Sequence, residues 1–182
     1  MNRYLLGSLA IVAVVLSGTL VGCSKSPPAA FNDPDVAFAQ GMIPHHQQAV
    51  EMARMADTQA ASAKVKDLAA RIEGAQGPEI EKMQGWLKDW GKAETSKGSM
   101  DGMHMGDGMM TAGDMKQLRG AKGATFDGLF LTMMVGHHEG AVKMAKQELK
   151  DGKSEEAKTL ARTIIAAQQR EIAEMKTLKA SV

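Results

Sequence analysis

The sequence predicts an all-α protein, a four-helix bundle built from two duplicated helical hairpins. Three observations support this fold class. Ala, Met, Lys, Glu and Gln, which favour helices, are abundant, and runs of β-branched residues are absent. Apolar residues recur at helical spacing over long stretches. A constant offset of 92 positions aligns the two halves without a gap, so that the pairs His45-His46 and His137-His138 coincide.

Residues 1–22 resemble a secretory signal rather than a part of the fold. A positive start at Met1–Arg3 precedes an apolar run that ends in small residues. The sequence Leu20-Val21-Gly22-Cys23 resembles a bacterial lipobox, in which Cys23 carries lipid and becomes the new N-terminus. The alternatives are an ordinary signal peptide with an incidental Cys, or an uncleaved membrane helix. We expect lipidation at Cys23, the only Cys of the chain, followed by a tether over residues 23–32.

The mature chain gives no basis for binding nucleic acid. The formal net charge of the full sequence is only +1, and removal of the signal segment takes away Arg3 and balances the charges. The remaining length suffices for one domain with its own core. We place this domain at residues 33–182, with a first repeat over 33–90, a Met-rich loop over 91–124 and a second repeat over 125–182.

The first repeat reads as two helices. Asp33 offers an N-cap and Pro34 suits the first helical position, so the first helix is predicted to run from there to about residue 59. Ser62 can cap the second helix, whose apolar residues keep helical spacing. The apolar positions include Met52 in the first helix and Met83 in the second, which we interpret as core residues.

The second repeat follows the same plan. Asp151-Gly152 is predicted to end its first helix, and Ser154 is predicted to cap its second. Met144 and Met175 match the two core methionines of the first repeat. Two such hairpins give a four-helix bundle. In the connecting loop, Thr111 and Asp114 resemble a capping box for a short helix around residues 112–121.

The histidine pairs are the leading candidates for metal ligands. Met42 and His46 are four residues apart on one helical face, and Met134 and His138 repeat this spacing. If the two helices cross near a pseudo-twofold axis, these two His and two Met would converge on one ion. Thioether and imidazole together suit copper, with Cu(I) favoured by the soft sulfur. His45 and His137 point about 100° away from their neighbours and are expected to face elsewhere, as further candidate ligands.

Structural roles are the alternative for these residues. A Met stripe at helical spacing is usually core, and a lone histidine is usually structural. Two copies of adjacent histidines on an otherwise apolar face favour metal binding instead.

Several polar residues could support the ligands from behind. Gln76 and Gln168 fall within the apolar stripes of the second helices, so they need buried partners. A hydrogen bond to a ligating histidine is one interpretation, and Glu79 and Glu171 could serve likewise. Ordinary contacts between helices are the alternative. Asp35 and Asp127 lie too far along the helix to share an ion with the local histidine, but each could hydrogen-bond the histidine of the other repeat.

The loop contains a second candidate site. Its sequence MDGMHMGDGMM gathers thioethers around one imidazole in a segment with no core to fill, and the candidate ligands are Met100, Met103, His104, Met105, Met109 and Met110. Such a cluster is typical of a low-specificity site for Cu(I) or Ag(I). A merely Met-rich linker is the alternative.

The phrases MIPHHQQAVEMA and MMVGHHEGAVKMA carry a resemblance to the domain-of-unknown-function family 305, which extends over about residues 33–180. The resemblance implies a ferritin-like bundle, an exported protein and, for some members, extracytoplasmic copper binding. The chain departs from equal repeats at Gln47-Gln48, where the second copy has Glu139-Gly140. This difference puts equal metal affinity of the two halves in doubt.

Together these features predict an exported metal-binding lipoprotein, lipid-anchored on the periplasmic or extracellular face of a membrane and not an enzyme. Copper is the expected ion, with silver as an alternative, and no organic cofactor is expected. Association into a homo-oligomer is compatible with the sequence. One alternative is a metal-free envelope interaction module. Another is a ferritin-like di-iron enzyme, which the absence of a Glu-x-x-His motif disfavours.

Overall fold

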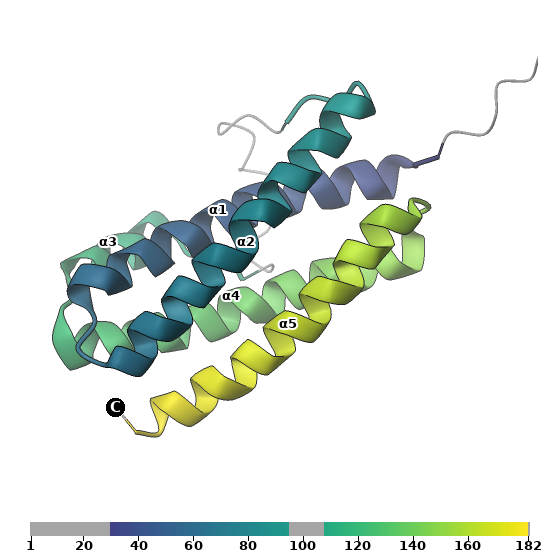
Figure 1. Cartoon of the computed structure of the whole chain (residues 1–182). Coiled ribbons are helices and arrows are strands. Elements are labelled where there is room, and N and C mark those ends of the chain that lie inside the picture. The colour runs from purple at the N-terminus through teal and green to yellow at the C-terminus, as the bar shows by residue number, and fades with distance from the viewer. Residues whose placement is uncertain (1–29, 95–107, 182) are drawn as a thin grey trace, which may run out of the picture.

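The fold consists of two antiparallel helical hairpins packed against each other (Figure 1). The structure is a computed structural model that describes residues 30–94 and 108–181. The described residues form the helices α1 (Asp33–Gln59), α2 (Ala63–Asp89), α3 (Ala112–Gly120), α4 (Gly123–Asp151) and α5 (Glu155–Lys179). The predicted all-α fold and the predicted four-helix bundle of two hairpins are therefore confirmed. Among the described helices, none has the length and apolarity needed to cross a membrane.

The two hairpins meet mainly through their first helices. α1 packs along α2 and α4 packs along α5, while α1 and α4 form the main contact between the hairpins. α2 and α5 barely touch each other. Figure 1 shows α1 and α4 running in opposite directions, with α3 at the end of the bundle where α1 ends and α4 begins. The result is an arrangement with a pseudo-twofold axis between α1 and α4.

The helix ends follow local capping chemistry, with one shift from the prediction. The N-cap of α1 is Asn32 and not Asp33, because Asn32 and Asp35 form a reciprocal capping box. Asp33 could not form this box, since the residue three positions after it is Val36. Ser62 occupies the N-cap of α2 as predicted but makes no side-chain capping bond, whereas Ser154 accepts a hydrogen bond from the Ala157 amide.

The remaining boundaries agree with the sequence. α4 ends at Asp151, directly before Gly152. Thr111 and Asp114 form the predicted capping box of α3, with the Asp114 amide donating to the Thr111 hydroxyl at 3.1 Å. Because short polar side chains satisfy the first free amides of a helix, such boundaries can be predicted from the sequence alone.

Two apolar clusters fill the bundle on either side of its middle. The first, which we call the Met42 cluster, contains Met42, Met83, Trp86, Leu160 and Ile164 among others. The second, the Met134 cluster, contains Met52, Leu68, Phe126, Phe130, Met134 and Met175 among others. Met52, Met83 and Met175 are fully buried, which confirms them as core residues, and Met144 is half-buried against the Met42 cluster.

Candidate metal centre

A layer of polar side chains crosses the middle of the bundle and separates the two apolar clusters. Each long helix contributes two residues to this central polar layer, which consists of His45 and His46 from α1, Gln76 and Glu79 from α2, His137 and His138 from α4, and Gln168 and Glu171 from α5. None of the histidines or glutamines in it is more than 3 % exposed. Burying so many polar groups is costly unless each finds a partner or a ligand.

The inner pair of the layer is formed by His45 and His137. Their ring centroids lie 3.7 Å apart, with an angle of 42° between the planes, across the contact of α1 with α4. The expectation that these two residues face elsewhere is therefore wrong. As predicted, the helical angle turns His45 away from His46 and His137 away from His138. Which of the two histidines of each pair faces the pseudo-twofold axis depends on how α1 packs against α4.

Burial keeps the imidazole of His137, one of the two inner histidines, uncharged. Removal from water lowers the pKa of His137 well below its ordinary value, and the nearby imidazoles of His45, His138 and His46 lower it further. A neutral imidazole has one nitrogen with a free lone pair, which is the form that binds metals. His137 thus needs to lose no proton near neutral pH before it can act as a ligand.

The outer pairs join each remaining histidine to a glutamate of its own hairpin. His46 Nε2 lies 2.8 Å from Glu79 Oε2, and His138 Nε2 lies 2.8 Å from Glu171 Oε2. Of the two arrangements that the sequence left open for these glutamates, the structure has the hydrogen bond to histidine. Because a carboxylate accepts, Nε2 is the donor, and a neutral ring in this orientation has its free lone pair on Nδ1. This arrangement resembles the carboxylate–histidine support found behind metal ligands.

Several atoms of the layer are buried without a hydrogen-bond partner. They include Nδ1 of His46 and of His138, Nε2 of His137, and Oε1 of Gln76 and of Gln168. The predicted hydrogen bond from a glutamine to a histidine is not present at these oxygens. Unpartnered polar atoms are rare in protein interiors and call for an explanation such as a bound ion or water. Lone pairs of three imidazoles and two amides fit a soft or borderline metal ion, with nitrogen as the main ligand.

Met42 and Met134 do not converge with His46 and His138 on a shared central ion. Met42 belongs to one apolar cluster and Met134 to the other, on opposite sides of the polar layer. His46 and His138 point their Nε2 atoms toward α2 and α5 respectively, away from the axis. The prediction of one site made by these four residues is wrong, because the sequence does not show at which height α1 and α4 cross.

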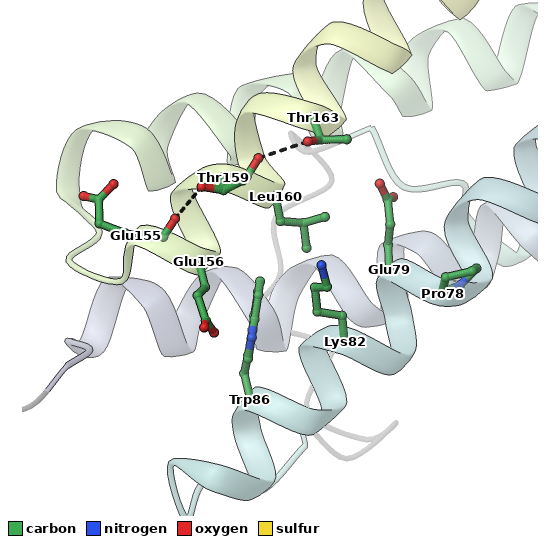
Figure 2. A pocket seen from close by; sticks show the side chains of 9 residues that line it. All are labelled: Pro78, Glu79, Lys82, Trp86, Glu155, Glu156, Thr159, Leu160 and Thr163. Atoms are coloured by element: carbon green, nitrogen blue, oxygen red, sulfur yellow. Dashed lines mark hydrogen bonds between the residues drawn. The ribbon is translucent and has the colours of Figure 1, made fainter.

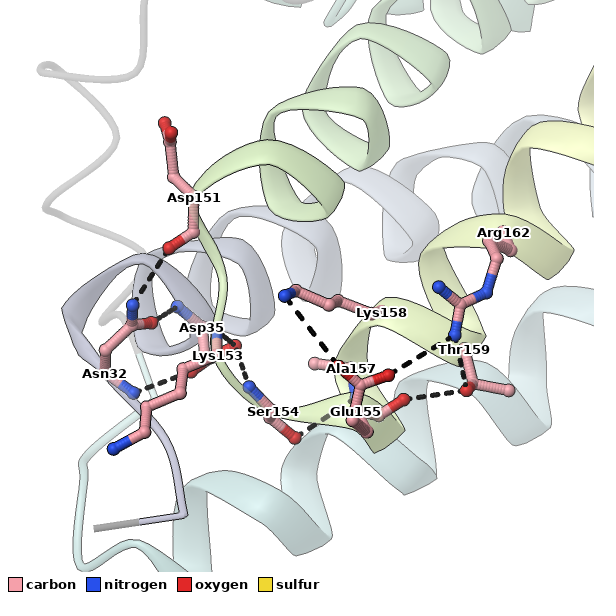
Figure 3. A network of polar contacts seen from close by, with 10 residues as sticks. All are labelled: Asn32, Asp35, Asp151, Lys153, Ser154, Glu155, Ala157, Lys158, Thr159 and Arg162. Carbon is pink, nitrogen blue, oxygen red and sulfur yellow. Dashed lines mark hydrogen bonds and ion pairs between the residues drawn. The ribbon is translucent and has the colours of Figure 1, made fainter. Parts of the chain in front are cut away.

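Asp35 and Asp127 reach the other hairpin, but they do not contact its histidines. Asp35 Oδ1 accepts hydrogen bonds from the amides of Lys153 and Ser154 at 3.0 and 2.9 Å (Figure 3). Asp127 repeats this with the amides of Ala61 and Ser62, at 3.2 and 2.9 Å. The prediction of a supporting role behind the metal ligands is corrected, since each aspartate caps the turn of the opposite hairpin instead.

These hydrogen bonds keep Asp35 ionised. Burial alone would raise the pKa of Asp35, but the amides of Ser154, Asn32 and Lys153 lower it below its ordinary value. The Asp35 carboxylate therefore provides a fixed negative charge. Figure 3 shows that it lies at the turn between α4 and α5.

The Met-rich loop lies only partly within the structure. The candidate ligands Met100, Met103, His104 and Met105, as well as the lipidation candidate Cys23, are outside the described residues. Met109 and Met110 are described and half-buried, and Met110 packs against the Met134 cluster. Gln48 of α1 holds Met110 by two hydrogen bonds, a contact that the sequence had marked only as a difference between the repeats.

A groove between α2 and α5 brings solvent close to the layer. It has a volume of about 650 Å³, and Figure 2 shows Glu79, Lys82 and Trp86 of α2 facing Leu160 and other residues of α5 across it. The side chain of Glu79 is 17 % exposed, whereas that of His46, its hydrogen-bond partner, is fully buried. Glu79 thus stands between this groove and the buried imidazole.

The repeated histidine phrases and the bundle agree with a known family. The sequence pattern of the family described as Domain of unknown function (DUF305) matches residues 35–179. The chain belongs to the DUF305 family. No curated protein matches the chain.

Solved structures of DUF305 proteins have the same fold. A Streptomyces coelicolor protein, whose name describes it as a secreted DUF305 protein, is 35 % identical with a TM-score of 0.74, covering 81 % of this chain and 93 % of that one. A DUF305 fragment from Deinococcus radiodurans is 28 % identical with a TM-score of 0.77, covering 86 % and 100 %.

A third relative has been studied with metal ions. CopM in its Cu(II)-bound form is 37 % identical to this chain with a TM-score of 0.70, covering 81 % of this chain and 96 % of CopM. CopM has also been solved in Cu(I)-bound and Ag-bound forms. The chain is therefore similar over most of its length to a protein that binds copper and silver.

Proposed function

We propose that this DUF305 protein is an exported copper-binding protein that sequesters the ion or passes it on, and that it catalyses no reaction. The observation that carries the proposal is the central polar layer, in which a buried histidine pair lies between two carboxylate-supported histidines. The similarity to CopM supports copper, with silver as a chemically related ion. The similarity to a secreted relative supports export.

Each part of the layer has a distinct role in this proposal. His45 and His137 would bind the ion at the pseudo-twofold axis. His46 and His138 would bind through Nδ1, with Glu79 and Glu171 fixing the ring orientation and increasing ligand basicity. Met42 and Met134 border the layer from opposite sides and could each add a thioether to the nearest histidine.

The Met-rich loop would form a second, less specific site for Cu(I) or Ag(I). Its thioethers are soft ligands in a segment of high Met content, and the proposed ligands are Met100, Met103, His104, Met105, Met109 and Met110.

The donor set favours copper over a di-iron centre. A di-iron site in a four-helix bundle needs several glutamates and Glu-x-x-His motifs. Imidazoles in pairs, with thioethers nearby, match the softer ligand preference of copper.

The test is anaerobic titration of the mature domain, without its lipid, with Cu(I), Cu(II), Zn(II) and Ag(I). We expect tight Cu(I) binding, with at least one ion lost in His45→Ala/His137→Ala and a separate loss after deletion of residues 100–110. His46→Ala/His138→Ala should weaken affinity by 10-fold or more. Bound ions are counted after desalting, and affinity is measured by competition with bicinchoninate.

Matched variants separate ligand loss from loss of structure. Met42→Leu/Met134→Leu tests the bordering thioethers, and Met83→Leu/Met175→Leu is its control, because both pairs are fully buried and both changes nearly conserve volume. Far-UV circular dichroism checks the folding of every variant. Unchanged Cu(I) stoichiometry in both histidine double variants would refute the assignment of the layer. Wild-type binding no better than micromolar would favour a metal-free interaction module.

A further inference from the structure

Two glutamines of α1 hold the two ends of the chain segment that links the hairpins. Gln40 Nε2 donates to the carbonyl oxygen of Ala93 at 2.8 Å. Gln48 Nε2 donates to the carbonyl oxygen of Met110 at 2.9 Å, and the Met110 amide donates back to Gln48 Oε1 at 2.7 Å. The two glutamines are two helical turns apart, about 12 Å along the axis, with His45 between them. Both ends of the segment are therefore held by side chains of α1.

The end held by Gln48 lies directly on the backbone that carries His137. Gly108 has φ +80°, and a Cβ atom there would lie 2.4 Å from the carbonyl oxygen of Gly136 and 3.1 Å from His137 Cα. Such contacts exclude a side chain, so glycine is required for this approach. Met110 then packs against the Met134 cluster, which leaves the half-buried Met109 between two fixed neighbours.

The second hairpin lacks the residue that makes this contact. The position that corresponds to Gln48 is Gly140, which has no side chain to hold a neighbouring segment. The docking of residues 108–110 is therefore specific to one side of the pseudo-twofold axis. This one-sided contact brings the backbone of Gly108 against that of Gly136 and His137, and Met109 follows directly in the docked segment.

We propose that Gln48 is a positioning residue that docks Gly108–Met110 beside His137, and that the Met109 thioether receives a soft monovalent cation, Cu(I) or Ag(I), and hands it to the inner histidine pair. The inference rests on the proposed copper function. Transfer within one molecule proceeds at a high effective concentration of ligand, typically millimolar for short tethers. In this transfer the cation exchanges one ligand at a time, so that a protein ligand is bound to it throughout its path into the core.

The experiment measures how fast Cu(I) moves from its bicinchoninate complex to the lipid-free mature protein, by anaerobic stopped-flow absorbance. The test variants are Gln48→Leu, which removes both hydrogen bonds at similar volume, and Met109→Leu, which removes only the thioether. Gln47→Leu is the matched control, because Gln47 is the exposed neighbour on the same helix turn. Amide hydrogen exchange of residues 109–112 reports docking independently of copper.

We expect Gln48→Leu to raise amide exchange at residues 109–112 at least 10-fold and to slow Cu(I) transfer at least 5-fold. Met109→Leu should slow transfer similarly and leave amide exchange unchanged. The final copper stoichiometry of Gln48→Leu should equal that of wild type, and Gln47→Leu should match wild type throughout.

Three results would overturn the inference. Transfer rates of both test variants within 2-fold of wild type would show that the docked segment does not handle the ion. Unchanged amide exchange in Gln48→Leu would show that Gln48 does not dock it. Loss of one bound copper ion in a test variant, with an unchanged rate of Cu(I) transfer, would show that the segment is a permanent ligand and not a transfer site. Failure of the wild-type protein to take up Cu(I) at all would instead refute the proposed function, and the two failures are thus distinguishable.

Discussion

His45 and His46 are neighbours in the sequence with different surroundings. His45 faces the ring of His137 across the axis, whereas His46 hydrogen-bonds Glu79 within its own hairpin. A rotation of about 100° between consecutive residues is sufficient for this division. One dipeptide therefore supplies both a histidine at the axis and a histidine paired with a carboxylate, and the second repeat supplies the same two again.

Glu148 is a buried carboxyl that only the second hairpin contains, since the first has Ala56 at the corresponding position. It is 2 % exposed, and its pKa is raised to about 8 by burial and by a hydrogen bond and charge repulsion from Asp35. The folded protein therefore holds a proton that the unfolded chain releases near its ordinary value of 4.5. The stability that this proton confers is fully present below pH 4.5 and is lost as the pH rises through about 8.

We predict that Glu148→Gln, whose side chain cannot ionise, does not show this loss of stability with rising pH. Relative to wild type, the free energy of unfolding of the variant should increase between pH 5 and pH 8 by on the order of 3 kcal/mol. Urea unfolding of both proteins at several pH values measures the difference, and subtraction cancels the opposite contribution of His137. Glu156→Gln, an exposed carboxylate on α5, is the control. A pH-independent difference would contradict the assigned pKa.

The sequence predicts what kind of chemistry a single residue contributes better than it predicts which residue lies next to it in the fold. The histidine pairs, the glutamates behind them and the core methionines follow from residue type and spacing. The pairing of His45 with His137 does not, because it depends on where α1 and α4 cross. Helical angles relate residues on one helix, and they contain no information about the rotation of that helix against its neighbour.

At the scale of elements, the helix boundaries follow from caps that the sequence displays. Two sequence signals place helix ends correctly: the capping box of Thr111 and Asp114 marks the start of α3, and Asp151-Gly152 marks the end of α4. Ser62 lies at the predicted N-cap without a side-chain capping bond, although Ser154, whose amide likewise donates to an aspartate of the other hairpin, does form one. Contacts between the hairpins thus add to the local caps and are not visible in the sequence near either turn.

We predict that Asp127→Ala destabilises the protein by about 1–3 kcal/mol, because the amides of Ala61 and Ser62 lose their acceptor in a part-buried turn. Thermal unfolding measures the change. Asp67→Ala serves as the control, since the Asp67 carboxylate pairs with Arg71 on the surface. Equal melting temperatures of the two variants would show that the turn does not depend on Asp127.

At the scale of the whole molecule, the internal repeat was the most informative feature of the sequence. It predicted two equivalent hairpins and hence the bundle, and the structure has both. It could not predict that a polar layer divides the core into the Met42 and Met134 clusters. That division appears only when all four long helices are placed side by side, because each helix alone shows one or two polar residues in an apolar stripe.

We propose that the bundle is attached to a membrane by lipid on Cys23. The predicted signal segment and tether precede the first described helix by few residues, so an anchored bundle would stay near the membrane surface. Cys23→Ser removes the thiol that would carry the lipid and should move the protein from the membrane fraction to the soluble fraction of cells. Ser24→Ala is the control. Retention of Cys23→Ser in the membrane fraction would refute the anchor.

The reciprocal caps of Asp35 and Asp127 have a consequence for the ancestry of the fold. Each hairpin completes the turn of the other, and the contact between them is the same patch used twice, as in an isologous homodimer. The chain is equivalent to such a dimer after gene duplication and fusion. Fusion makes assembly independent of concentration, and it releases each copy from symmetry. Gln48, Gly140 and Glu148 mark where the two copies have since diverged.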